Sequence, residues 1–74
     1  MTLKDEVKVL LIKSGLTLTG LVKALNEKYN RNDSVQNLNG KLTRETLKYT
    51  EAKEISEILG YEIKWIPKDN ISKE

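Results

Sequence analysis

The sequence predicts a mainly α-helical fold of four helices followed by one short β-strand. Apolar residues recur at the spacing of a helix in four separate stretches, and only after Gly60 do they alternate with charged residues as in a strand. Polar capping residues and glycines stand where these helical stretches begin and end. The chain has 74 residues, enough for one small domain, which we expect to occupy residues 1–67 ahead of a polar tail over residues 68–74.

The first two predicted helices cover about residues 3–14 and 18–29. Thr2 caps the first helix and Thr17 the second, with Thr19 as the alternative, because a threonine hydroxyl can accept a hydrogen bond from a free N–H group at a helix start. A glycine follows the first helix and favours its end there. The apolar positions expected to face the core are Leu3, Val7, Leu10 and Leu11 in the first helix and Leu18, Leu21, Val22, Leu25 and Tyr29 in the second.

The third predicted helix covers residues 34–44 and the fourth about residues 51–59. Asp33 or Ser34 caps the third helix, and Thr50 caps the fourth. The third helix has a narrow apolar stripe, so most of its surface is left to polar side chains. The apolar positions are Val35, Leu38 and Leu42 in the third helix and Ala52, Ile55, Ile58 and Leu59 in the fourth.

The alternating segment over residues 61–66 is predicted to form a short C-terminal strand. A single strand leaves its backbone groups unpaired, so it needs a partner. One candidate is residues 46–49, which are rich in strand-forming residues and would complete a small two-stranded sheet. This internal pairing is favoured because both pieces lie in one chain. The alternative is pairing with a second subunit, which would give a homodimer through Tyr61, Ile63 and Trp65.

The composition excludes many kinds of catalytic and metal site. The chain has 13 Lys and Arg, 11 Asp and Glu, and neither His nor Cys. Zinc sites built on His and Cys, thiol nucleophiles, disulfides and serine–histidine relays therefore cannot form. Glu51, Glu54 and Glu57 recur along the fourth predicted helix and are expected to face solvent. We expect no enzymatic activity, no metal and no cofactor.

No segment has the length of a membrane span. The longest apolar run, residues 9–12, is far shorter than the roughly 20 residues that a membrane helix needs. The acidic residues close to Met1 also do not fit the arrangement of a signal peptide. We therefore expect no membrane partner and a cytoplasmic location.

The charges are distributed unevenly along the chain. Residues 13–48 carry seven basic and three acidic residues, whereas residues 49–74 carry four basic and six acidic ones. A basic middle segment followed by an acidic end favours a polyanion as partner. The alternative is a chance distribution in a Lys-rich chain.

The polar face of the third predicted helix indicates which polyanion this is. Amide side chains carry a donor and an acceptor together, so Gln36 and Asn37 can each pair with an adenine edge in the major groove of DNA. Lys41 and Arg44 can neutralise phosphates, and Arg44 can alternatively bind guanine. Thr17 and the free N–H groups at the start of the second helix suit a phosphate contact. The alternative interpretation is an ordinary solvated helix face.

Three segments match the pattern of a known motif. They are GLTLTGLVKAL at residues 15–25, SVQNLNGKLTR at residues 34–44 and EISEILGY at residues 54–61. Through them the chain resembles the phage-repressor and Cro-like helix-turn-helix family, also called xenobiotic-response-element or lambda-repressor-like. It departs from the family in its longer link at residues 26–33, which implies an extended second helix or an enlarged turn. The predicted strand also stands where the family has a fifth helix.

The resemblance implies a four-helix lambda-repressor-like bundle that binds double-stranded DNA sequence-specifically, as a small bacterial or phage transcriptional regulator. Residues 34–44 would be its recognition helix in the major groove. The alternative is a protein–protein interaction module that keeps the fold without binding DNA, with the fourth helix and the strand as its contact surface. The predicted DNA-binding residues are Thr17, Thr19, Lys23, Ser34, Gln36, Asn37, Gly40, Lys41 and Arg44.

Overall fold

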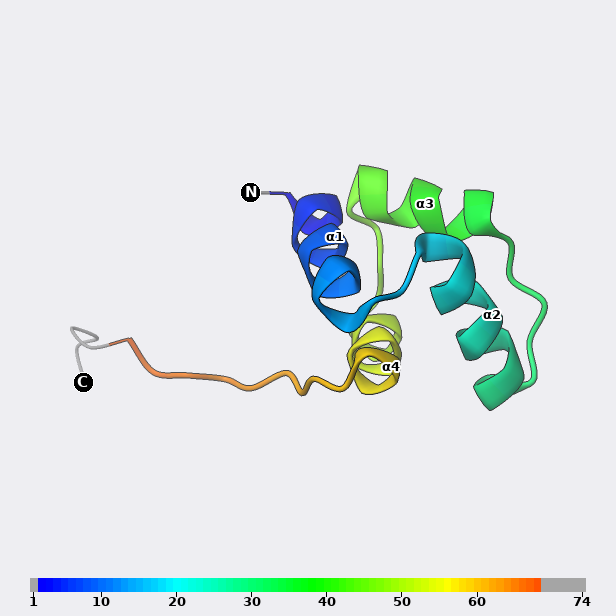
Figure 1. Ribbon diagram of the computed structural model, residues 1–74. Coiled ribbons are helices and arrows are strands. Elements are labelled where there is room, and N and C mark those ends of the chain that lie inside the picture. The colour runs from blue at the N-terminus through cyan, green and yellow to red at the C-terminus, as the bar shows by residue number, and fades with distance from the viewer. Residues whose placement is uncertain (1, 69–74) are drawn as a thin grey trace.

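The computed structural model describes residues 2–68 as a small helical bundle with an extended C-terminal arm (Figure 1). The helices are α1 (Leu3–Ser14), α2 (Leu18–Tyr29), α3 (Val35–Arg44) and α4 (Tyr49–Leu59). Figure 1 shows α3 lying across the first turns of α2 and beside the start of α1, while α4 lies on the other side of the bundle. The arm, residues 61–68, leaves the end of α4 and extends away from the helices.

Hydroxyl side chains cap the first three helices. The caps are the Thr2 hydroxyl accepting from the Asp5 N–H at 3.2 Å, the Thr17 hydroxyl accepting from the Gly20 N–H at 3.1 Å and the Ser34 hydroxyl accepting from the Asn37 N–H at 3.0 Å. Each bond satisfies an N–H group that has no partner within its helix and contributes about 1 kcal/mol. The predicted starts of α1 and α2 are confirmed, and of the two candidates for α3 the cap is Ser34.

The start of α4 differs from the prediction. The helix begins at Tyr49 with Lys48 as its cap, so the expected start after Thr50 is wrong. The cause is Glu51, whose carboxylate accepts a hydrogen bond from the Lys48 N–H at 2.9 Å and closes the first turn in place of a threonine hydroxyl. The predicted extended piece at residues 46–49 forms no strand, because Tyr49 belongs to α4 and residues 46–48 are a link in which Lys48 has extended backbone.

The predicted strand at residues 61–66 is not seen either. Residues 61–68 are extended, but within the described part of the chain they form no strand and no two-stranded sheet. The segment expected to pair with them is taken up by the link before α4 and by the first turn of α4. Trp65 is consequently 86% exposed, with its ring centroid 6.3 Å from that of Tyr49. The predicted polar tail lies, apart from its first residue, outside the described residues.

The core contains the apolar positions that the helical spacing predicts. Leu21 and Leu42 are the most deeply buried large side chains, at 0% and 2% exposure. Leu16 and Leu47, which lie in the links, pack against the core as well. No helix within residues 2–68 has both the length and the apolar character needed to cross a membrane. The buried apolar residues are Val7, Leu11, Leu21, Val22, Leu25, Leu38, Leu42, Ile55 and Leu59.

Leu42→Ala should destabilise the fold strongly. Its side chain joins α3 to the core at 2% exposure, and a large-to-small substitution of this kind costs about 2–5 kcal/mol. Urea unfolding followed by circular dichroism measures the loss. The control is Ile12→Ala, because Ile12 is 77% exposed and its truncation should change the free energy of unfolding by less than about 0.5 kcal/mol. Equal losses for the two variants would contradict this description of the core.

Candidate nucleic-acid interface

The outer side of α3 is a polar face with free side chains. The helix turns Val35, Leu38 and Leu42 toward the body of the protein, so the residues opposite them point to solvent. Among residues 2–68, the side chains of this face make no hydrogen bond or ion pair, which leaves their donors and acceptors available to a ligand. We call it the α3 face, and its residues are Gln36, Asn37, Gly40, Thr43 and Arg44.

Gly40 provides room for Arg44 on this face. A Cβ atom placed at Gly40 would lie 3.0 and 3.1 Å from the two terminal guanidinium nitrogens of Arg44. The guanidinium therefore lies back over the helix, where any larger residue than glycine would displace it. The predicted site residue Gly40 thus acts on the α3 face through the position of Arg44.

The predicted phosphate-anchoring residues gather where α2 meets the start of α3. Thr19 and Lys23 of α2 line a shallow hollow together with Ser34, the cap of α3. Thr17 is exposed at the start of α2, where its hydroxyl oxygen accepts from the Gly20 N–H. The structure therefore brings the N-terminal ends of two helices, three hydroxyl groups and one lysine to neighbouring positions, all groups that can bind phosphate oxygens. Two acids, Glu27 and Asp33, line the same hollow.

An amide side chain fixes the direction in which α3 starts. Asn26 donates from Nδ2 to the Asp33 carbonyl at 3.0 Å and accepts at Oδ1 from the Asp33 N–H at 2.9 Å. This pair closes the link between α2 and α3. Since α2 continues to Tyr29, the link is confined to residues 30–34. Asn26 was not among the predicted site residues, since nothing in its spacing distinguishes it from a surface amide.

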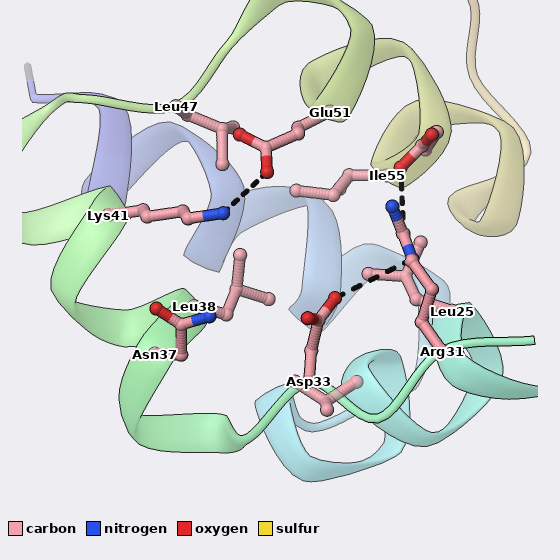
Figure 2. Close-up of a pocket in the computed structure, with 11 residues that line it drawn as sticks. Leu25, Arg31, Asp33, Asn37, Leu38, Lys41, Leu47, Glu51 and Ile55 are labelled. Atoms are coloured by element: carbon pink, nitrogen blue, oxygen red, sulfur yellow. Dashed lines mark hydrogen bonds and ion pairs between the residues drawn. The ribbon is translucent and has the colours of Figure 1, made fainter. Parts of the chain in front are cut away.

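Lys41 is not part of the free α3 face. Figure 2 shows its side chain crossing a small hollow to Glu51 of α4, with an Nζ–Oε2 distance of 2.5 Å. The side chain of Lys41 is 31% exposed and that of Glu51 is 23% exposed. The predicted phosphate ligand is thus held in an ion pair between α3 and α4.

Two further acids of α4 repeat this arrangement. Glu54 binds Arg31 of the link at 2.8 Å, and Glu57 binds Lys28 of α2 at 3.1 Å. Together with Glu51 they form what we call the acid ladder, in which each of the three acids meets a cation from a different part of the α2–α3 segment. The expectation that these acids face solvent is wrong for Glu51 and Glu54, whose side chains are 23% and 24% exposed.

Two carboxyls of the ladder have a lowered pKa. The hydrogen bond from Lys41, followed by that from the Lys48 N–H, holds the pKa of Glu51 below its usual range. The hydrogen bond from Lys28, followed by that from the Tyr29 hydroxyl, likewise lowers the pKa of Glu57. Both carboxylates are therefore ionised at neutral pH, where the lysines that bind them are positively charged.

The ion pairs of the acid ladder account for part of the uneven distribution of charge along the sequence. Three of the seven cations in residues 13–48 are paired with acids of α4. Many of the basic residues in the middle of the chain thus neutralise acidic residues near its end, within the same protein. Within residues 2–68, Lys23 and Arg44 form no ion pair and remain available beside the α3 face.

No protein-family model, curated protein or solved structure matches this chain. The resemblance to the helix-turn-helix family therefore stays a prediction. The candidate interface is defined by the arrangement of α2 and α3 and by the side chains that they expose.

Lowering the pH should destabilise the fold through the ladder. A carboxyl with a lowered pKa in the folded state contributes stability above its unfolded pKa, about 4.3 for Glu, and loses it as the pH falls through the folded value. The urea midpoint of the protein should accordingly drop between about pH 5 and pH 3. Glu51→Gln should flatten this drop, because it removes one of the carboxyls with a lowered pKa.

Glu27→Gln is the matched control for this measurement, because Glu27 is exposed on α2 and forms no ion pair within residues 2–68. It should leave the pH dependence unchanged. A profile for Glu51→Gln that coincides with the wild-type profile would show that the ladder does not cause the drop.

Proposed function

We propose that the protein binds double-stranded DNA sequence-specifically, as a small cytoplasmic regulator of transcription of bacterial or phage type. The main support for this proposal is the α3 face. It presents unpaired amide and guanidinium groups on a helix that buries only a narrow stripe of apolar side chains. A helix that exposes such groups can enter the major groove of DNA. The lambda-repressor-like arrangement, with α2 crossing the backbone and α3 as the recognition helix, is part of the same proposal.

Base recognition falls to the amides of the α3 face. Gln36 and Asn37 are exposed neighbours near the N-terminal end of α3, the end that helix-turn-helix proteins direct at base edges. Each amide can form a pair of hydrogen bonds with adenine, and the Arg44 guanidinium can form a pair with guanine. These groups give the interface its sequence preference.

Phosphate contacts fix the orientation of the protein without reading sequence. The hydroxyls of Thr17, Thr19 and Ser34 and the cation of Lys23 surround the starts of α2 and α3 and take this role. We assign Lys41 instead to the contact between α3 and α4, because its ammonium group is already bound by Glu51.

Gln36→Ala and Asn37→Ala should change base preference at one base pair each. The loss of a paired hydrogen bond to a base costs about 1–3 kcal/mol for the preferred base and little for the others. Selection from a random pool of duplexes identifies the site, and fluorescence anisotropy on single-base variants of that site measures the loss.

Asn39→Ala is the control, since Asn39 lies on α3 but lines the hollow toward α1. It should bind all duplexes as the wild type does. A wild-type protein that binds no duplex at low salt would overturn the proposal and favour an interaction module without DNA binding.

The arm supports a second part of the proposal, a homodimer. Tyr61, Ile63 and Trp65 are 41%, 40% and 86% exposed on an extended segment whose residues 62–68 have no backbone partner in the described part of the chain. The arm leaves the bundle beside α1, at a distance from α3 (Figure 1), so a second copy can bind there without covering the α3 face.

The order of side chains in the arm is complementary to itself. If two arms pair antiparallel about Ile63, Glu62 of each lies opposite Lys64 of the other, and Tyr61 lies opposite Trp65. Opposite charges and aromatic pairs across strands each contribute about 0.2–1 kcal/mol. This register places all four of these favourable pairs in one ribbon.

A charge exchange tests the dimer and its register together. Glu62→Lys should weaken the dimer, because it sets two lysine side chains opposite each other in both halves of the ribbon. Adding Lys64→Glu should restore the dimer, because opposite charges then face each other again. Sedimentation equilibrium gives the dissociation constant of each variant. A wild-type protein that stays monomeric at about millimolar concentration, or a double variant that behaves like Glu62→Lys, would contradict this assembly.

A further inference from the structure

The position of Lys41 on α3 differs from that of the other predicted phosphate ligands. Lys41 follows Asn37 by one helical turn, so its side chain leaves α3 at the edge of the α3 face. Asn37 and Lys41 line the same hollow between α3 and α4 (Figure 2). Lys41 is therefore near enough to the proposed DNA surface to contact a phosphate if its side chain is free to turn outward.

The structure holds this side chain inward. Glu51 binds its ammonium group directly, and two further acids, Asp33 and Glu54, line the same hollow. In Figure 2 the side chain of Lys41 extends toward Glu51 and away from the outer surface of α3. The positive charge of Lys41 is thus compensated within the protein.

We propose that Glu51 lowers the sequence-independent part of the affinity of the protein for DNA by withholding Lys41 from phosphate. This inference rests on the proposed function and adds a role for α4, a helix outside the base-reading surface. Glu51 acts through Lys41 and does not itself contact DNA.

The physical reason is the release of counterions. Each phosphate that a cation neutralises adds about 0.9 to the slope of log affinity against log salt, whatever the base sequence. An extra free lysine therefore strengthens binding to every duplex, whereas the hydrogen bonds of Gln36 and Asn37 strengthen binding to one site. A lysine held in an ion pair therefore lowers the phosphate-dependent part of the affinity for all duplexes alike and leaves the hydrogen bonds of Gln36 and Asn37 unchanged.

The chain offers a matched pair of variants. Glu51→Gln and Glu57→Gln remove the same charge from the same helix. The partner of Glu51 is on α3, whereas the partner of Glu57 is Lys28 at the far end of α2. The amide oxygen introduced by Glu51→Gln can still accept the hydrogen bond from the Lys48 N–H, so the start of α4 is kept. Circular dichroism confirms that both variants are folded before binding is measured.

The experiment measures affinity for a random-sequence duplex over a range of salt concentrations. Glu51→Gln should bind this duplex about three- to tenfold more tightly than the wild type and steepen the salt slope by about one, the equivalent of one additional phosphate contact. Glu57→Gln should change the affinity by less than about twofold with no change in slope. Adding Lys41→Ala to Glu51→Gln should return the slope to the wild-type value.

Each outcome decides between the two proposals. If the wild type prefers its selected site but Glu51→Gln and Glu57→Gln give the same affinity and slope, the role of Glu51 is wrong while the DNA-binding function stands. If the double variant keeps the steeper slope, the gained contact does not come from Lys41 and the inference is likewise overturned. If the wild type binds no duplex, both the function and the inference fail.

Discussion

The position of α4 against the two helices before it is set by the acid ladder. Burial of leucines draws the helices together, but this attraction has no direction and does not select one alignment. Glu51, Glu54 and Glu57 do select one, because each acid meets a cation from a different element: α3, the link or α2. Ion pairs near the surface contribute only about 0–1 kcal/mol each. Their main effect is therefore to align α4, whereas the burial of Val35, Leu38 and Leu42 turns the α3 face to solvent.

The fold was predictable from the sequence where an element depends on interactions between residues that are close in the sequence. Caps such as Thr2, Thr17 and Ser34 bond within one turn of their own helix, so neighbouring residues carry all the information. The strand over residues 61–66 was not predictable in the same way, since a strand exists only with a partner. The expected internal partner was lost once Glu51 started α4 at Tyr49, and residues 61–66 are all exposed.

The candidate site was predictable in its residue types but not in its pairing. The spacing of α3 identified Gln36, Asn37 and Arg44 as exposed, which they are. Lys41 was predicted to be free as well, because the order of charges along the sequence does not show which carboxylate lies beside it in the fold. The recurrence of three acids along α4 was the available signal. A set of like charges on one face of a helix can mark a contact with cations elsewhere as well as a solvated surface.

The two hydrogen bonds between Asn26 and Asp33 have a consequence for the evolution of the chain. The amide closes the loop at its base, so the direction of α3 does not depend on the residues between. Asn32 is exposed on this loop, whereas Asn30 ends α2 in the left-handed conformation at φ 55° and Arg31 binds Glu54. Substitutions at Asn32 would therefore be tolerated without turning α3, while Asn30 is restricted to residues that accept this backbone conformation.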